Sequence, residues 1–308
     1  MTPSPSSAPL RRIPFAPGDV DAIVAFCAAH GGLYDAALMR FLLLELTSDP
    51  AGVIVIDDDA GPALVSTVVD RARNGADAAS LETLGVRAPI AAAPFARLVI
   101  EPAVRFARAG ERRALHVALP PTLIPADGAE QVLRDAGFAH AYDTFAMRRP
   151  GSAPAAASPE ALPAGWSWAA LDGARVDEAH AALVEIFRDA PSTNLTPLED
   201  FREAVVSGAS RWHVLLDGGR LTGLVQIALH GADGPIRGEV RTIGRVPTYR
   251  GRGVGPRLVA EGLRLLREGG AGDVDLAVEA ANERALDLYR RFAFEVVART
   301  PVFALTLR

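Results

Sequence analysis

The sequence predicts an α/β (α+β) fold arranged as two similar domains, and three observations lead to this class. The chain has 308 residues, and a domain commonly takes roughly 100–200. Residues 150–165, PGSAPAAASPEALPAG, contain four prolines and no apolar periodicity, which is typical of a linker. Helices and strands are expected in the same order on both sides. We therefore expect domains at 1–150 and 165–308, joined by a linker at 151–164.

Hydrophobic periodicity predicts the elements of the first domain in order. Apolar residues on one helical face indicate helices, and short apolar or alternating runs indicate strands. A turn at 58–61 separates two such strands and so predicts a hairpin. The expected elements are helices at 19–29, 35–47, 94–109 and 128–136, and strands at 52–57, 63–70, 80–87, 113–119 and 142–148.

The second domain repeats this order. The Asp217-Gly218-Gly219 turn predicts its hairpin. LRDAGF at 133–138 is similar to YRRFAF at 289–294, which lies 156 residues later, so an internal repeat by pattern is favoured over two unrelated α/β domains. The expected elements are helices at 175–189, 197–207, 255–268 and 283–291, and strands at 211–216, 221–230, 239–246, 273–279 and 300–307.

The chain contains no lysine, because all 32 basic residues counted as Lys or Arg are arginines. This excludes a lysine Schiff base and a Walker phosphate loop. A codon bias toward Arg and Ala accounts for the absence without any functional meaning. The net charge of −5, with neither half basic, argues against a nucleic-acid partner.

Other composition features bound the location and the chemistry. The single Cys27 excludes a disulfide within the chain, and the six histidines lack close metal-ligand spacing, so we expect no metal site. The first residues lack an apolar signal segment, and the apolar run at 41–46 is too short to span a bilayer. We expect a cytoplasmic protein without a membrane partner, as a monomer or homodimer.

The sharpest local feature is a glycine-rich loop, VPTYRGRGVGPRL, between a strand and an amphipathic helix at 246–258. Glycines before a helix N-terminus let main-chain N–H groups face outward, and Arg250, Arg252 and Arg257 add charge. A phosphate or pyrophosphate ligand is expected, with a plain turn as the alternative. Pro256 stands where a dinucleotide-binding fingerprint needs glycine.

These residues carry a family resemblance. RGRGVG at 250–255 matches the R/Q-x-x-G-x-G/A signature of the GCN5-related N-acetyltransferases (GNAT), and residues 277–294 resemble the family's N-x-x-A-x-x-L-Y-x-x-x-G-F segment. Gly238-Glu239-Val240 resembles a strand of tandem members. Ala293 departs from the family's glycine, which suggests mild strain at a helix end.

The resemblance implies a mixed, mainly antiparallel twisted sheet flanked by helices in each domain. The first half has no glycine at 87–95 and has Leu133 in place of Tyr289. We therefore predict a degenerate GNAT-like domain at 1–150 without a pyrophosphate loop, and a catalytic GNAT domain at 165–308.

The resemblance also implies an activity: an acyltransferase, transferring groups other than amino-acyl groups, that moves acetyl from acetyl-coenzyme A (acetyl-CoA) to a small molecule's primary amine by direct attack in a ternary complex. The alternative is a non-catalytic acetyl-CoA-binding regulatory module. The expected cofactor-binding residues are Ile243, Gly244 and Arg245 on the strand, Arg250, Gly251, Arg252, Gly253, Val254, Gly255 and Pro256 in the loop, and Asn282.

Two side chains are expected to be catalytic. Glu239 is the candidate base for the amine, with a surface salt bridge as its alternative. Tyr289 is the candidate acid for the leaving thiolate, with a core position as its alternative. Asn282 is equally explained as a helix cap, and Glu279 as a strand-end residue. Asp189 and Asn194 follow a helix and are candidates for amine binding, although helix termination explains them as well.

Overall fold

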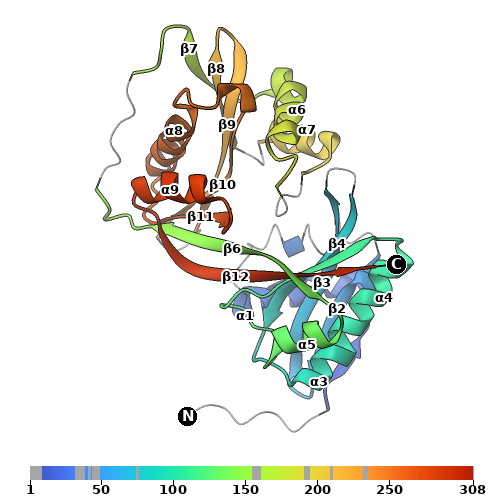
Figure 1. Ribbon diagram of the computed structural model, residues 1–308. Helices are drawn as coiled ribbons and strands as arrows, with labels where there is room; N and C mark the ends of the chain where they lie inside the picture. The colour runs from blue at the N-terminus through green and yellow to red at the C-terminus, as the bar shows by residue number, and fades with distance from the viewer. Residues whose placement is uncertain are drawn as a thin grey trace. The chain divides into compact units, whose positions relative to one another are not determined.

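The computed structural model divides into two compact units (Figure 1), called unit 1 and unit 2 here. Unit 1 comprises Met1–Tyr142 and Thr300–Arg308, and unit 2 comprises Asp143–Arg299. The structure describes residues 9–31, 39–40, 43, 49–73, 76–154, 161–190, 195–208, 211–231 and 235–307. The predicted helix at 35–47 lies almost wholly outside the described residues, as do 155–160 of the predicted linker. No helix within these ranges is long and apolar enough to cross a bilayer.

In unit 1 the strands pair in the order β1-β2-β3-β4-β5-β12. Neighbours are antiparallel except β4 and β5, which are parallel. The strands are β1 (Arg11–Ile13), β2 (Val53–Asp58), β3 (Gly61–Arg73), β4 (Ala76–Val86), β5 (Ala114–Ala118) and β12 (Glu295–Thr306).

Unit 2 has the corresponding order β7-β8-β9-β10-β11-β6, and its parallel pair is β10 and β11. The two sheets therefore repeat one topology, as the internal repeat predicts. The strands are β7 (Trp166–Ala170), β8 (Arg211–Asp217), β9 (Arg220–His230), β10 (Arg237–Arg245), β11 (Val274–Glu279) and β6 (Ala139–Arg149). The short first strands β1 and β7 were not predicted.

The last strand of each sheet comes from the other half of the sequence. In unit 1, Val302–Thr306 of β12 pairs with β5. In unit 2, Thr144–Arg149 of β6 pairs with β11, and Arg148 binds Asp275 there at 2.6 Å. The unit boundaries therefore differ from the proposed division at 151–164. The physical reason is that a strand's own sequence pattern does not specify its pairing partner.

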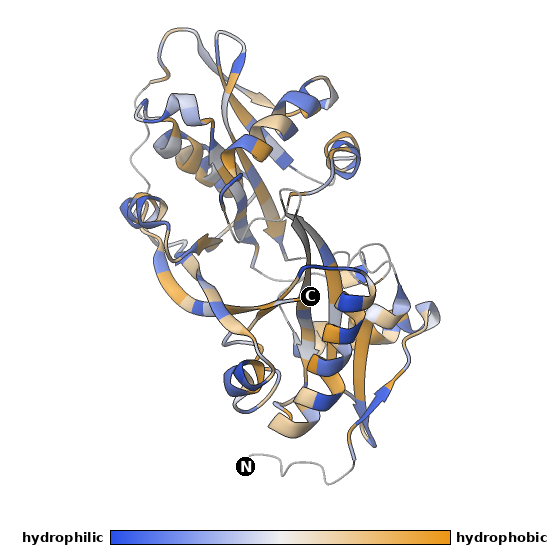
Figure 2. Ribbon diagram, turned by 45° about the vertical axis from the view of Figure 1, so that its right-hand side comes forward, coloured by the Kyte–Doolittle hydropathy of each residue, from blue (hydrophilic) through white to orange (hydrophobic). Residues whose placement is uncertain are grey.

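Helices cover both faces of each sheet because strand residues on both faces are apolar (Figure 2). In unit 1, Val53 and Val55 pack toward α1, while Ile54 and Ile56 pack toward the helices on the other face. Unit 2 has α6 and α7 on one face and α8 and α9 on the other. The helices are α1 (Val20–His30), α3 (Ala92–Phe95), α4 (Glu101–Ala109), α5 (Ala129–Asp135), α6 (Val176–Ile186), α7 (Leu198–Val206), α8 (Val254–Glu268) and α9 (Glu283–Arg291).

The predicted helix at 94–109 is interrupted by a π-helical segment, Ala96–Ile100, between α3 and α4. Pro102 follows directly in the first turn of α4 and supplies no N–H, so the regular helical pattern of hydrogen bonds cannot continue unchanged there.

The same cap ends α5 and α9. Phe138 N–H donates to Leu133 O at 2.9 Å, and Phe294 N–H donates to Tyr289 O at 3.1 Å. At each helix end the backbone turns through a left-handed residue, which is Gly137 at φ 88° in unit 1 and Ala293 at φ 60° in unit 2. This is the Schellman geometry, which favours glycine. The strain expected from the Ala293 departure is therefore present in the backbone.

Candidate functional site

Unit 2 contains a cavity of about 880 Å³, called the unit 2 cavity here. Side chains of α6, α7 and β8 line one part, and β10, β11 and the beginnings of α8 and α9 line the other. Seven of the predicted site residues line it: Ile243, Gly244, Arg245, Arg250, Gly255, Asn282 and Tyr289. The sequence therefore identified much of one cavity from residues up to 46 positions apart.

The cavity follows a place where two strands separate. β10 and β11 pair only from Gly238 with Val274 to Val240 with Leu276. Beyond a bulge between Val240 and Thr242, β10 pairs with β9 alone. The two strands thus diverge, and one edge of β10 loses its partner.

The alternation of the strand identifies which main-chain groups face this open edge. Val246 N–H donates to Thr222 O at 2.9 Å, on the β9 side. Main-chain groups alternate between the two edges, so those of Gly244 also face β9, whereas those of Ile243 and Arg245 face the side that β11 has left. Ile243 and Arg245, two of the residues expected to bind the cofactor, therefore have main-chain groups at this open edge.

The glycine loop leads from β10 into α8 through left-handed turns at Gly251 (φ 81°) and Gly253 (φ 73°). Within the part of the chain that the structure describes, the N–H groups of Gly251, Gly253, Val254 and Gly255 have no acceptor. Pro256 has no N–H, and at the third helical position none is needed. A helix N-terminus with several free N–H groups is suited to bind an anion.

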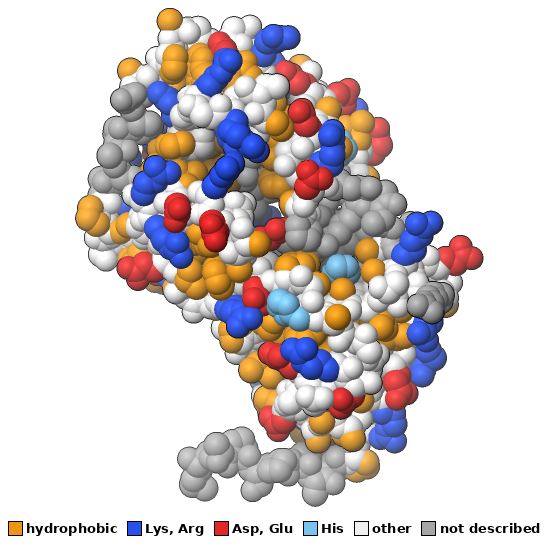
Figure 3. Space-filling view, in the orientation of Figure 1, with side chains coloured by type: hydrophobic (Ala, Val, Ile, Leu, Met, Phe, Trp, Pro, Cys, Tyr) orange, Lys and Arg blue, Asp and Glu red, His pale blue; other side chains and the backbone are white. Residues whose placement is uncertain are grey.

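Three arginines from different elements line the cavity near this loop: Arg245 from β10, Arg250 from the loop and Arg284 from α9. Burial lowers the pKa of Arg245, and the positive charges of Arg250 and Arg284 lower it further. Figure 3 shows arginine side chains gathered over the α8 and α9 region of unit 2. Such like charges are stabilised when an anion lies among them.

Arg284 was not among the predicted site residues, although the sequence contains a signal for it. It is the second residue of α9, where the helix dipole disfavours a cation. An anionic ligand in the cavity would stabilise a cation at that position.

Two predicted loop cations have other contacts. The Arg252 guanidinium carbon lies 5.1 Å from the centre of the Tyr249 ring, and that of Arg257 lies 5.9 Å from the Trp166 ring. Arg257 also donates to Gly253 O at 3.0 Å. Neither arginine lines the cavity. The loop faces the cavity mainly through Arg250 and Gly255, because the other predicted loop residues are also outside its lining: Gly251, Gly253, Val254 and Pro256.

Helix α9 brings Asn282 and Tyr289 to the cavity. Asn282 caps the helix, because its Oδ1 accepts a hydrogen bond from Ala285 N–H at 3.2 Å, and it also lines the cavity. Tyr289 is 6% exposed and packs edge-on against Phe294. Burial raises the pKa of the Tyr289 phenol, so the phenol keeps its proton and serves as a hydrogen-bond donor.

The two carboxylates differ in location. Glu239 Oε2 accepts hydrogen bonds from His230 Nε2 at 2.8 Å and from Arg241 Nε at 3.0 Å, and Glu239 does not line the cavity. Glu279, at the end of β11, does line it. Asp189 is exposed and outside the lining, and Asn194 lies outside the described residues. No three of the described His, Cys, Asp or Glu side chains form a metal-binding group.

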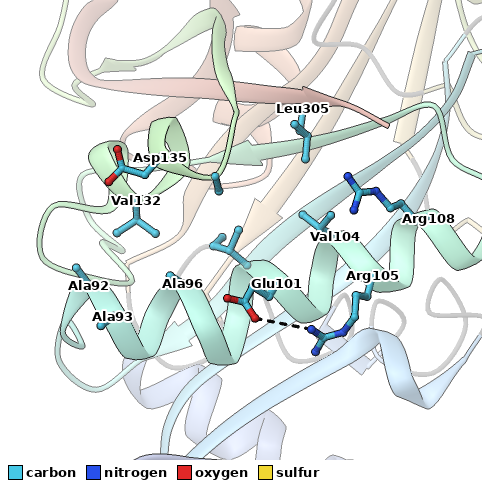
Figure 4. A pocket seen from close by; sticks show the side chains of 12 residues that line it. Ala92, Ala93, Ala96, Glu101, Val104, Arg105, Arg108, Val132, Asp135 and Leu305 are labelled. Carbon is cyan, nitrogen blue, oxygen red and sulfur yellow. Dashed lines mark ion pairs between the residues drawn. The ribbon is translucent and has the colours of Figure 1, made fainter. Parts of the chain in front are cut away.

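In unit 1 the segment ahead of α3 makes main-chain hydrogen bonds to the loop before α5. Ahead of α3, Ile90 N–H donates to Pro125 O and Asp127 N–H donates to Ile90 O, both at 3.1 Å. The residues between β5 and α5 thus bond to the segment that corresponds to the glycine loop. Unit 1 has a different cavity of about 640 Å³ between α4 and α5 (Figure 4), where Glu101 and Asp135 accompany Arg105 and Arg108.

A splayed strand edge, a helix N-terminus with free N–H groups and an arginine cluster together form a site suited to an extended anionic ligand. Residues 177–294 match the family model described as Acetyltransferase (GNAT) family. A mycothiol acetyltransferase of Clavibacter sepedonicus is 32% identical over 218 residues, covering 66% of this chain and 70% of that protein. The chain therefore belongs to the GNAT acetyltransferase family.

Further comparisons agree with this membership. A mycothiol acetyltransferase of Thermobispora bispora is 35% identical over 166 residues, 51% of this chain and 55% of that protein, so the chain spans about half the length of such curated relatives. The crystal structure of a tandem GNAT protein from the clavulanic acid biosynthesis pathway shares the fold, with a TM-score of 0.71 over 97% of this chain and 98% of that one, at 17% identity.

Proposed function

We propose that this protein is an N-acetyltransferase that moves the acetyl group of acetyl-CoA to the primary amine of a small molecule. One observation carries the proposal: Gly255, whose N–H is free at the start of α8, lines the unit 2 cavity together with Arg245, Arg250 and Arg284. The open edge of β10 at Ile243 lines the same cavity. A pyrophosphate attached to an extended arm fits that combination of charge and edge.

In the proposed complex the cosubstrate follows β10. The pyrophosphate accepts a hydrogen bond from the Gly255 N–H, which lines the cavity, and the arginines balance its charge. The pantetheine arm pairs with the open edge at Ile243 and Arg245. The Ile243 N–H is then available to stabilise the oxyanion formed when the amine attacks the acetyl carbonyl.

The amine must lose a proton before or during this attack. Glu239, the base predicted from the sequence, lies outside the lining and would act through water. Glu279 lines the cavity and is the alternative candidate base, because it needs no intervening water to reach an amine there. Comparing kcat/KM of Glu239→Gln and Glu279→Gln across pH separates the two, because the variant that loses the base also loses the rising limb of the profile. A Glu239→Gln profile identical to wild type would remove Glu239 from the mechanism.

The departing coenzyme A thiolate must be stabilised and protonated. Tyr289 is suited to this step, since its buried phenol stays protonated and lines the cavity. A hydrogen bond from the phenol to the sulfur lowers the cost of the leaving charge. The phenol then passes its proton to the sulfur and regains one, through solvent, from the proton that the attacking amine releases.

A coenzyme A release assay on the full chain tests the function. Amines related to mycothiol are the first acceptors to test, because the relatives' name mentions mycothiol. Arg250→Ala and Arg284→Ala should raise the KM for acetyl-CoA at least tenfold. Arg252→Ala is the matched control, since its guanidinium lies over Tyr249 outside the lining. Binding of acetyl-CoA without turnover on any amine would favour the non-catalytic regulatory module.

A further inference from the structure

The part of the unit 2 cavity formed by α6, α7 and β8, called the α6–α7 half here, differs in chemistry from the arginine-lined part. Its wall includes His180 and Leu183 from α6, Phe201 and Ala204 from α7, and Trp212 from β8. The rings form a chain of contacts: His180 to Phe201 at 5.7 Å between centroids, and Phe201 to Trp212 at 5.4 Å, nearly perpendicular. The proposed cosubstrate uses none of these residues.

A hydrogen bond selects one tautomer of the neutral His180 ring. Its Nε2 lies 2.9 Å from Thr196 O, and a carbonyl oxygen can only accept a hydrogen bond. Nε2 therefore carries the proton in the neutral ring, and Nδ1 offers a lone pair. Trp212 presents the opposite group: it is 7% exposed, and its indole N–H has no acceptor among the described residues.

Charge restricts what this half accepts. The charged side chains among the described lining residues are four arginines, Arg241, Arg245, Arg250 and Arg284, and one carboxylate, Glu279. Arg241 is already paired with Glu239 at 3.0 Å. With the other three arginines assigned to the cosubstrate, an acceptor with several ammonium groups meets Glu279 as the sole carboxylate of the described lining. An acceptor with a carboxylate finds no arginine outside those assigned to the cosubstrate or paired with Glu239.

We propose that the α6–α7 half selects a primary amine on an uncharged, ring-bearing body, with His180, Phe201 and Trp212 as specificity-determining residues. The aromatic side chains supply contact with the ring, and His180 Nδ1 accepts a hydrogen bond from an N–H or O–H group of the acceptor. This inference rests on the proposed function, because the α6–α7 half is an acceptor site only if acetyl transfer occurs.

Four amines test the proposal on the full chain saturated with coenzyme A. Phenethylamine has the ring and one amine; n-butylamine lacks the ring, phenylalanine adds a carboxylate, and spermidine adds further cations. The chain has three tryptophans, so a ¹⁵N-labelled sample gives three indole signals, and Trp212→Phe assigns one of them. Phenethylamine should shift the Trp212 signal at a concentration at least tenfold lower than the other three amines.

A pair of variants on α7 adds a steric test. Ala204→Leu fills the α6–α7 half and should raise the phenethylamine concentration needed for the shift at least tenfold, with coenzyme A affinity unchanged. Val206→Leu, on the same helix and 68% exposed, should change neither. Equal response to any of the three other amines, no Trp212 shift with phenethylamine, or no effect of Ala204→Leu would overturn the proposal.

The same samples separate this inference from the proposed function. Coenzyme A release is measured with each amine alongside the indole shifts. Release that is equally fast with spermidine or phenylalanine overturns the selectivity and leaves acetyl transfer intact. A selective Trp212 shift without coenzyme A release from acetyl-CoA supports the subsite and counts against acetyl transfer.

Discussion

At the scale of single residues, environment sets the chemistry that a residue type only makes available. Tyr289 and Glu239 were both predicted to be catalytic from their place in a motif. The structure brings Tyr289 to the cavity wall but directs Glu239 to His230 and Arg241. The difference depends on contacts made across β9 and β10, which a motif does not contain. Arg284 was missed for a related reason. It lies near Arg245 and Arg250, which come from two other elements, and a local motif does not contain that arrangement.

Tyr289→Phe should lower kcat about 10²-fold, the size expected for loss of one general acid. Affinity for acetyl-CoA should stay within about twofold, because the hydrogen bond to sulfur matters mainly as charge develops there. Tyr249→Phe is the control, since its hydroxyl binds Asp217 at 3.2 Å outside the cavity lining. Steady-state kinetics and calorimetric titration measure the two effects; unchanged turnover in Tyr289→Phe would refute its role.

Glu261 on α8 makes folding stability sensitive to acid. Burial opposes its charge, but hydrogen bonds from Arg264 and His213 prevail and lower the pKa of Glu261 from 4.5 to about 2. A depressed carboxylate pKa contributes stability above pH 4.5, and this contribution is lost as the pH falls toward 2. The contribution is up to about 3 kcal/mol.

Urea unfolding of wild type and Glu261→Gln between pH 6 and pH 2 measures this contribution. The free-energy difference between the two proteins should be constant above pH 4.5 and shrink below it. Glu268→Gln is the control, because Glu268 binds the same Arg264 at 2.6 Å but is 59% exposed. A pH-independent gap between wild type and Glu261→Gln contradicts the assignment.

At the scale of elements, local patterns predicted most helices and strands, and the two repeated helix ends show how far a pattern reaches. The alignment of 133–138 with 289–294 anticipated that the chain turns in the same way at both ends, which the Schellman bonds confirm. The strands β1 and β7 were missed because they are short, and β1 in particular is largely exposed, so little apolar alternation marks it. The bulge in β10 leaves no comparable signal in the sequence.

These two helix ends allow a reciprocal experiment. Ala293→Gly should raise the free energy of unfolding by up to about 1 kcal/mol, because glycine adopts a left-handed φ without strain. Gly137→Ala should lower it by a similar amount at the corresponding turn, where the added Cβ meets only Leu305 at 3.6 Å. Denaturant unfolding measures both. Opposite signs support a backbone origin, whereas equal signs would assign the effect to packing.

At the scale of the whole molecule, the sequence predicted two similar units but not how the chain is divided between them. Composition located a proline-rich segment at 150–165, yet β6 before it completes the sheet of unit 2, and the final strand completes the sheet of unit 1. Pairing between distant strands depends on which edges are free after the rest has folded. That information belongs to the assembled sheet and not to any window of residues.

The two units should also differ in ligand binding. Acetyl-CoA should bind the full chain with a stoichiometry of one, because residues 88–95 at the start of α3 contain neither the glycines nor the arginines of the loop in unit 2. Calorimetric titration of the full chain gives this number. The double variant Arg250→Ala with Arg284→Ala should remove most of the binding; a second site that persists in it would show that unit 1 binds the cosubstrate.

The strand exchange also sets an order for folding during synthesis. Ala118 of β5 pairs with Val302, so the sheet of unit 1 stays one strand short until nearly all of unit 2 has left the ribosome. An open sheet edge in a nascent chain attracts other strands. Residues 300–306 thus form the strand that closes this edge. A ribosome stalled just before residue 300 would release a chain with an incomplete first sheet, although the residues that line the unit 2 cavity had already been made.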